Sequence, residues 1–108
     1  MAGRIFRVLF SGFARRRVRQ IHNFEEQVNG NKRASAVQKE ILKQAAELEN
    51  LPGSNPPYLD AEDDEVHYRK AFSYKIIFQV LKKAGEVFIL TIRNDAEDSR
   101  RSKMNFEN

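Results

Sequence analysis

The amino-acid sequence predicts an α+β fold: an N-terminal strand, an α-helical hairpin, and then a three-stranded antiparallel meander. Three observations predict it. The first residues alternate between apolar and polar side chains, as a strand with one buried face does. Two stretches then carry apolar residues at steps of three and four, which is the pattern of amphipathic helices. Residues 66–93 contain three short runs rich in valine, isoleucine, phenylalanine and tyrosine, which favour strands.

The first strand is expected at residues 4–10. Its alternation places Arg7 on one face and an apolar set on the other, made of Phe6, Val8 and Phe10. Ser11 follows at once, and a serine hydroxyl at this position can accept a hydrogen bond from a backbone N–H of the first helical turn. Ser11 therefore predicts where the strand ends and a helix begins.

The helical hairpin is expected between residues 13 and 51. The apolar stripe of its first helix stops at Asn29-Gly30 and consists of Ala14, Val18, Ile21, Phe24 and Val28. The stripe of the second helix ends before Leu51-Pro52-Gly53 and consists of Ala34, Val37, Ile41, Ala45 and Leu48. Because the link between the two stripes is short, the helices are expected to run antiparallel.

Residues 1–93 are expected to form a single domain, since the 108 residues of the chain suffice for one small core. Residues 54–65 carry Pro56-Pro57 and an acidic run without periodicity, so they predict a surface loop. Lys82-Lys83-Ala84-Gly85 predicts the turn between the last two strands. Residues 94–108 form a polar tail whose large apolar residues are Met104 and Phe106.

Composition excludes several classes of protein. Hydrophobic residues make up 41% and charged residues 31% of the chain, which is typical of a soluble globular domain rather than a collagen-like or disordered one. No cysteine is present, which excludes disulfides, zinc–thiolate sites and thiol nucleophiles and suits a reducing compartment. The apolar stretch at residues 5–13 is too short, and too interrupted by Arg7, for a secretion signal or a membrane span. We therefore expect a cytoplasmic protein that does not contact a membrane.

Positive charge is concentrated near the N-terminus, within a net charge of +4. The arginines there have no acidic residue between them: Arg4, Arg7, Arg15, Arg16, Arg17 and Arg19. Acidic residues fill one later loop: Asp60, Glu62, Asp63, Asp64 and Glu65. Arg15, Arg16 and Arg19 share a broad helix face opposite the apolar stripe, so they could bind a polyanionic or acidic partner. The alternative is a solvated helix face without a partner.

The two central strands are apolar on both faces. Residues 76–78 and 88–90 are consecutive apolar side chains, and only one helical hairpin is available to cover them. The hairpin can cover one face, so the tail, a second copy of the chain or a separate partner must meet the other. An apolar sheet face rimmed by cations would be a binding surface. In the alternative, Met104 and Phe106 fold back and complete a two-sided core.

The search for catalytic groups and cofactor sites is mostly negative. His22 and His67 have no companions at the spacing of metal ligands, the acidic loop lacks the alternating ligands of a calcium loop, and no glycine-rich phosphate loop is present. We expect no metal and no cofactor. The strands still offer Tyr68, Arg69, Lys70, Lys75 and Arg93. Cations there could stabilise a phosphoryl transition state and the tyrosine could move a proton, or these residues could be charges that protect strand edges.

The order of elements and the local sequences resemble the RelE/ParE superfamily of bacterial toxin–antitoxin toxins. The second helix runs through LENLPGSNPP into a proline-containing loop, HYRKAFSYKIIFQV follows, and VFILTIRN completes the sheet. In that family an arginine-bearing strand precedes a strand of the type Tyr-(Lys/Arg)-Ile-Ile-(Tyr/Phe), and a strand of the type Val-x-Ile-Leu-x-Ile comes last. The most specific part of the match is Tyr68-Arg69 with Tyr74-Lys75-Ile76-Ile77-Phe78.

The resemblance implies the toxin of a type II toxin–antitoxin system, a plasmid-stabilisation module in which a cognate antitoxin protein neutralises the toxin. Two activities share this fold, so the fold does not decide between them. The RelE-like branch cleaves messenger RNA on the ribosome, and in that branch the catalytic residues would be Arg69, Lys75, Arg93 and Tyr68. The ParE-like branch inhibits DNA gyrase. Whether the chain is an enzyme therefore depends on the branch.

Departures from the nuclease pattern favour the ParE-like branch. The nucleases usually carry lysines just before the arginine strand and a C-terminal tyrosine, whereas here that approach is acidic and the tail has no tyrosine. Asn94 stands where many relatives have a histidine. The candidates for binding the antitoxin or gyrase are then Arg15, Arg16, Arg19, Arg69, Lys70, Lys75 and Arg93. A basic module that binds nucleic acid without being toxic is a second class of function, and it would bind with a steep dependence on salt.

Overall fold

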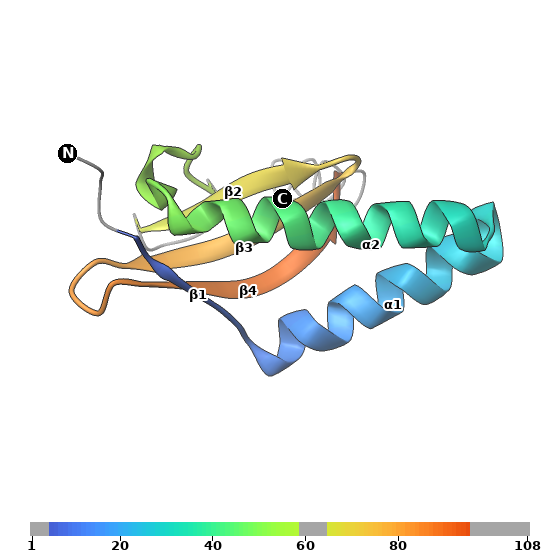
Figure 1. Cartoon of the computed structure of the whole chain (residues 1–108), viewed down its shortest axis with the longest axis horizontal. Helices are drawn as coiled ribbons and strands as arrows, with labels where there is room; N and C mark the ends of the chain where they lie inside the picture. The colour runs from blue at the N-terminus through green and yellow to red at the C-terminus, as the bar shows by residue number, and fades with distance from the viewer. Residues whose placement is uncertain (1–4, 59–64, 96–108) are drawn as a thin grey trace, which may run out of the picture.

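The computed structural model of the chain describes residues 5–58 and 65–95. Its elements follow in the predicted order: β1 (Arg7–Phe10), α1 (Gly12–Asn29), α2 (Asn31–Ala46), β2 (Val66–Ala71), β3 (Tyr74–Leu81) and β4 (Glu86–Asn94) (Figure 1). Two short 3-10 helices, Glu47–Glu49 and Pro52–Ser54, lie between α2 and β2. The α+β fold class predicted from the sequence is confirmed.

The strands form a four-stranded mixed sheet in the order β1-β4-β3-β2. β2, β3 and β4 are the predicted antiparallel meander, and β1 joins it parallel to β4, with Val8 beside Val87. The helical hairpin returns the chain to the end of the sheet where β1 began, so β2 runs parallel to β1 (Figure 1). The alternation in the first residues predicted a strand, but not its neighbour.

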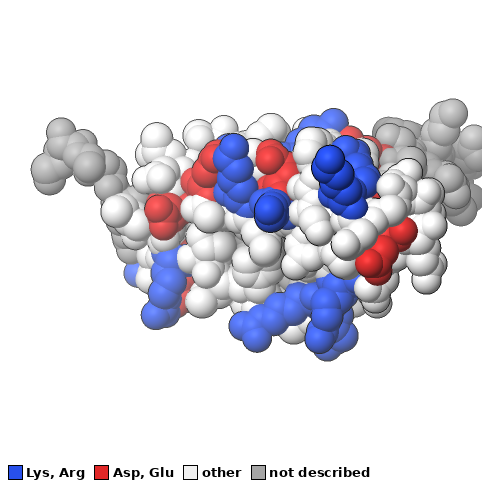
Figure 2. Space-filling view, turned by 45° about the vertical axis from the view of Figure 1, so that its right-hand side comes forward, with Lys and Arg blue, Asp and Glu red and all other residues white. Residues whose placement is uncertain are grey.

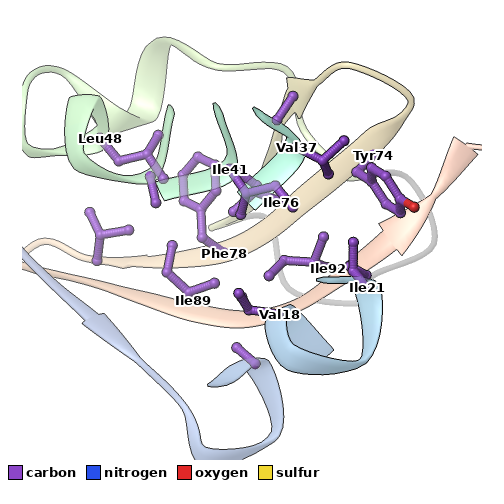
Figure 3. Packing of buried hydrophobic residues seen from close by; sticks show 14 of the residues in the cluster. Val18, Ile21, Val37, Ile41, Leu48, Tyr74, Ile76, Phe78, Ile89 and Ile92 are labelled. Atoms are coloured by element: carbon purple, nitrogen blue, oxygen red, sulfur yellow. The ribbon is translucent and has the colours of Figure 1, made fainter. Parts of the chain in front are cut away.

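Both helices pack on the same face of the sheet and bury one core against it (Figures 1 and 3). All the apolar positions predicted for the second helix are buried, from Ala34 to Leu48. From the sheet, alternate residues of β3 enter this core. β4 contributes Val87, Ile89 and Ile92, and its alternation is interrupted after Ile89 by an irregularity in its pairing with β3. The largest fully buried side chains of the cluster are Phe78, Ile41, Leu48, Ile76, Ile89 and Ile92.

Local signals explain where the helices begin and end. Ser11 caps α1 as predicted, because its hydroxyl accepts a hydrogen bond from the backbone N–H of Ala14 at 2.9 Å. Gly30 alone separates α1 from α2, and its φ of 91° lies in a region that residues with a Cβ rarely adopt. The predicted turn of residues 82–85 is also present, since β3 ends at Leu81 and β4 begins at Glu86.

The apolar stripe predicted for the first helix is wrong at its C-terminal end. Phe24 and Val28 are 55% and 61% exposed, whereas Glu25 is 6% exposed and continues the buried line of Val18 and Ile21. Steps of four, three and four residues from Ala14 lead to Glu25, so helix geometry favours this position over Phe24. Side-chain polarity alone favours Phe24 and Val28 for the buried stripe, and this prediction is wrong because burial follows the helical spacing.

The ends of the predicted segments shift by a few residues. β1 begins at Arg7, while Ile5 forms only an isolated bridge with Asn50, and residue 4 lies outside the described residues. β4 continues to Asn94, and the N–H of Asp95 donates to the carbonyl of Ser73 at 2.8 Å. The sheet therefore includes Asn94, which the sequence assigned to the tail. Residues 96–108, with Met104 and Phe106, lie outside the described residues.

The predicted surface loop is partly attached to the sheet. The N–H of Tyr58 donates to the carbonyl of Val66 at 2.9 Å, and the N–H of Tyr68 donates to that of Pro56 at 3.0 Å. This short segment therefore pairs with the outer edge of β2. The acidic residues from 60 to 64 lie outside the described residues. Within residues 5–58 and 65–95, neither helix is long and apolar enough to cross a membrane.

Candidate functional site

The face of the sheet that the helices leave uncovered carries a group of polar side chains. β2 contributes Tyr68 and Lys70, because alternate residues of a strand point to the same face. Lys70 pairs with Lys75 of β3, and Lys75 pairs with Arg93 of β4. Directly paired residues of antiparallel strands have their side chains on the same face. We call Tyr68, Lys70, Lys75 and Arg93 the open-face cluster.

Close contacts hold Lys75 at the centre of the open-face cluster. Its Nζ lies 4.8 Å from the centre of the Tyr68 ring, which is the distance of a cation–π contact. Tyr68 is fixed in turn by the ring of Tyr58, which meets it edge-on at 6.5 Å between ring centres. The Lys75 side chain is 23% exposed, so most of it is buried.

Asp95 lies beside both lysines of the open-face cluster and offsets one of their two charges. Its Oδ2 lies 2.7 Å from the Nζ of Lys70, and its Oδ1 lies 3.9 Å from the Nζ of Lys75. The hydrogen bond and the negative charge of Asp95 raise the pKa of Lys70. Oδ1 is buried and makes no hydrogen bond among the described residues. The sequence did not predict this contact, because Asp95 follows the last predicted strand and only the position of the β2–β3 turn brings it beside Lys70.

An apolar floor adjoins the open-face cluster. Ile77 pairs with Tyr68 and is 3% exposed, and Phe88, Leu90 and Thr91 of β4 are half-buried. A ligand on this face would therefore meet both apolar surface and positive charge. Such a surface suits an acidic protein segment with apolar side chains, or the phosphate backbone of a nucleic acid.

Arg69 lies on the other face of the sheet, against α2. Its Nε donates to Gln44 at 2.6 Å, and one terminal nitrogen lies 2.6 Å from Oε1 of Glu47. The other terminal nitrogen donates to the side chain of Asn55 at 3.3 Å. These bonds tie β2 to the C-terminal end of α2 and to the loop after it. The structure thus separates Arg69 from Lys75 and Arg93, which the sequence analysis had grouped with it.

The arginines predicted on the first helix divide into two kinds. Arg15, Arg16 and Arg19 are exposed, as the helical spacing predicts. Arg17 is half-buried, and its Nε donates to the carbonyl of Ile92 at 2.9 Å, which fastens α1 to β4. Figure 2 shows basic side chains in an upper and a lower group, with acidic side chains beside the upper group.

The two histidines lie in different surroundings. His67 is 9% exposed, stacks on Phe78 at 5.9 Å between ring centres, and has its Nδ1 2.8 Å from the carbonyl of Asn55. His22 is half-buried on α1. In residues 5–58 and 65–95 no group of histidine, aspartate and glutamate residues could hold a metal ion.

A buried polar pair that the sequence analysis missed joins α1 to β3. The hydroxyl of Tyr74 donates to Glu25 at 2.6 Å, and Asn29 donates to the other carboxylate oxygen at 2.9 Å. The bond from Tyr74 lowers the pKa of Glu25, and burial together with that carboxylate raises the pKa of Tyr74 to about 12. The signal was the position of Glu25 on the helical stripe, which demanded a partner for a buried carboxylate.

Comparisons with known proteins give matches to solved structures. No family model and no curated protein matches the sequence. A chain of the chromosomal ParDE TA system from P. aeruginosa superposes with a TM-score of 0.70 and 16% identity, covering 85% of this chain and 98% of that one. A chain of the toxin-antitoxin complex RelBE2 from Mycobacterium tuberculosis superposes with a TM-score of 0.62 and 15% identity, covering 83% of this chain and 91% of that one. The chain therefore has the RelE/ParE toxin fold.

Proposed function

We propose that this chain is the toxin of a bacterial type II toxin–antitoxin system and is neutralised by a cognate antitoxin. The observation that carries the proposal is the shared fold, which extends over 98% of the ParDE chain, combined with the uncovered sheet face. Fold alone does not imply function. Here, however, the uncovered face also has the half-buried apolar floor and the cations that a tightly bound acidic protein would need.

The antitoxin is expected to be an acidic protein with apolar anchors. Lys75 and Arg93 pair across β3 and β4, and Asp95 supplies the negative charge beside Lys70 and Lys75. A carboxylate of the antitoxin would add to this charge balance near Arg93, while its apolar side chains would cover Phe88 and Leu90. Covering such a face removes apolar surface from water and is a main source of binding energy.

We propose DNA gyrase as the target, as in the ParE-like branch. In support, Arg69 is held by Gln44 and Glu47 on the face opposite Lys75 and Arg93. The arginine and lysine set that the nuclease branch uses would therefore be divided between two faces of the sheet. A phosphoryl transition state needs its cations within reach of the same oxygen atoms, so this division argues against cleavage of RNA.

A ribosome-dependent messenger RNA endonuclease is the second candidate, and one observation favours it. Tyr68, Lys75 and Arg93 share the uncovered face, with Lys75 against the Tyr68 ring. This arrangement places two cations and a phenol where a phosphate could approach them. An enzyme of this kind would use Arg69 only to position β2.

Expression of the chain in bacteria tests the proposed toxin function. We expect growth arrest when the chain is induced alone, and normal growth when the product of the adjacent open reading frame is produced with it. Normal growth under both conditions, with the folded chain present in the cell, would contradict a toxin. Salt-dependent binding to nucleic acid without growth arrest would instead favour the basic nucleic-acid-binding module.

Two assays with the purified chain distinguish the targets. The gyrase proposal predicts that gyrase is trapped on cleaved DNA and that messenger RNA on ribosomes remains intact. If ribosomes instead show cut messenger RNA, Lys75→Met and Arg93→Met should each lower the rate by about 10²–10³, as loss of one transition-state contact does. Lys32→Met, a change at an exposed lysine of α2, is the matched control. Cleavage of messenger RNA that depends on Lys75 and Arg93 would favour the ribosome over gyrase as the target.

A further inference from the structure

The free edge of β1 is a feature that the proposed function does not use. β1 is the end strand of the sheet in the order β1-β4-β3-β2 (Figure 1). The N–H of Arg7 donates to the carbonyl of Gly85 at 2.9 Å, and the N–H of Ser11 donates to the carbonyl of Ile89 at 3.0 Å. Every second residue from Arg7 to Ser11 therefore directs its backbone groups toward β4. In a parallel ladder the residues between them direct N–H and C=O the other way. Val8 and Phe10 therefore present their backbone groups on the free edge.

Just before β1, the chain at Ile5 and Phe6 already pairs with residues 49 and 50. The N–H of Phe6 donates to the carbonyl of Glu49 at 2.8 Å, and Ile5 forms an antiparallel bridge with Asn50. Glu49 ends a 3-10 helix, so this pairing does not continue along β1. No described segment pairs with the edge at Val8 and Phe10. Unpaired strand edges are sites where a further strand can add.

A hollow of about 320 Å³ lies along this part of the edge. Its lining comes from β1, α1 and α2 and consists of Val8, Leu9, Phe10, Arg15, Val18 and Leu42. Leu9 and Leu42 are 36% and 44% exposed although both are large and apolar. Arg15 is the charged residue of the lining, and no ion pair joins it to another residue of the described ranges. Within the described residues, the hollow thus combines an apolar floor with the cation of Arg15, which has no ion-pair partner there.

We propose that the free edge of β1 binds an extended acidic segment of a partner protein, which adds to the sheet as a further strand. Its backbone pairs with Val8 and Phe10, one apolar side chain enters the hollow against Leu42, and a carboxylate meets Arg15. Charge complementarity selects this occupant, because a basic segment or a second copy of this edge would bring cations against Arg15. The inference rests on the proposed function only for the identity of the partner, which would be the antitoxin.

Nuclear magnetic resonance with a short synthetic peptide of alternating acidic and valine residues tests the surface directly. We expect the backbone N–H signals of Val8 and Phe10 to shift on titration and their hydrogen exchange to slow. Arg15→Glu and Leu42→Ser should each weaken binding by about tenfold, the loss of one charge-assisted or apolar contact. Lys32→Glu and Val28→Ser change exposed residues outside the hollow and should leave the affinity unchanged.

A second peptide, with lysine in place of the acidic residues, tests whether charge selects the strand that adds to β1. This peptide should not bind, and Arg15→Gln repeats the test if Arg15→Glu does not fold. No binding of the acidic peptide, equal binding of both peptides, or shifts confined to the open-face cluster would overturn the inference.

The complex with the adjacent gene product separates the strand addition from the toxin proposal. A complex in which Val8 and Phe10 still exchange rapidly would overturn the strand addition, while leaving the toxin proposal intact. If no gene product neutralises the chain, the toxin proposal fails, and the peptide titration still decides whether the edge of β1 binds an acidic strand.

Discussion

The two faces of the sheet differ in how their polar side chains are used. On the face covered by the helices, Ile76 and Phe78 are fully buried, and the side chain of Arg69 is tied to Gln44, Glu47 and Asn55. On the uncovered face, Phe88 and Leu90 are only half-buried beside cations. Among the described residues, the covered face is thus filled by contacts within the chain, whereas the face that the helices leave uncovered combines half-buried apolar residues with charge that a partner could use.

The same strands produce both faces, so strand sequence alone does not separate structure from function. Arg69 and Lys70 are neighbours in β2, yet one anchors α2 and the other joins the open-face cluster. Alternation sends consecutive side chains to opposite faces. The position of the helices then decides which of the two becomes part of the scaffold. Substitutions on each face can test this division.

The largest effect on stability is expected at the centre of the covered face. Phe78→Ala should lower the free energy of unfolding by about 3–5 kcal/mol, because it removes a fully buried ring and leaves a cavity. Phe88→Ala on the uncovered face should cost less than about 2 kcal/mol, since that ring is half-buried. Urea denaturation of both variants measures the difference. Equal losses would mean that the two faces do not differ in packing.

The next effect concerns the cations of the two faces. Arg69→Met should lower the free energy of unfolding by roughly 1–3 kcal/mol, because Gln44 and Glu47 lose a charged partner. Arg93→Met on the uncovered face should change it by less than about 1 kcal/mol and should weaken the target or antitoxin interaction instead. Thermal unfolding and a pull-down with the antitoxin check the two halves. Normal stability of Arg69→Met would disprove its anchoring role.

A smaller effect is expected from pH, through Glu25 and Tyr74. The folded pKa of Glu25 is lowered, so its stabilising contribution is present above its ordinary value of 4.5 and is lost as the pH falls through the lowered value. The folded pKa of Tyr74 is raised to about 12, so its contribution is present below 10.0 and is lost as the pH rises through about 12. Melting temperatures across this range measure both losses.

Two variants assign these losses to the pair. Glu25→Gln should be less stable at neutral pH and should lose less stability on acidification than the unchanged chain does. Tyr74→Phe should lack the loss at alkaline pH, because no phenol remains to ionise. Unchanged pH profiles in both variants would show that other groups control the pH dependence.

The smallest change in stability is expected at the exposed arginines of α1. Arg15→Glu combined with Arg19→Glu should alter the free energy of unfolding by no more than about 1 kcal/mol, since both side chains are exposed. Toxicity or partner binding should nevertheless weaken if this helix face meets an acidic surface. Circular dichroism and growth assays measure the two properties. Full toxicity in a normally folded double variant would mean that these arginines form only a solvated face.

The sequence predicted the elements themselves because their signals are local. Apolar spacing identified α2 with all its buried positions, Ser11 marked the beginning of α1, and residues 82–85 marked the last turn. These features depend on neighbours within a few residues, through hydrogen bonds in one turn or alternation in one strand. The candidate cations were also predicted from the sequence, because charged residues that interrupt or end apolar strand runs can be identified without a structure.

The order of the elements and the set of charged candidates therefore follow from the sequence alone. The three-dimensional arrangement is needed to show that Arg69 belongs to the scaffold, that Asp95 pairs with Lys70, and that Glu25 is buried against Tyr74. Each of these pairs joins residues far apart in the chain. The contacts of Arg69 and Glu25 arise from the path of the helical hairpin over the sheet, whereas that of Asp95 arises from the pairing of the strands around the β2–β3 turn. Helical spacing and strand alternation carry no information about either.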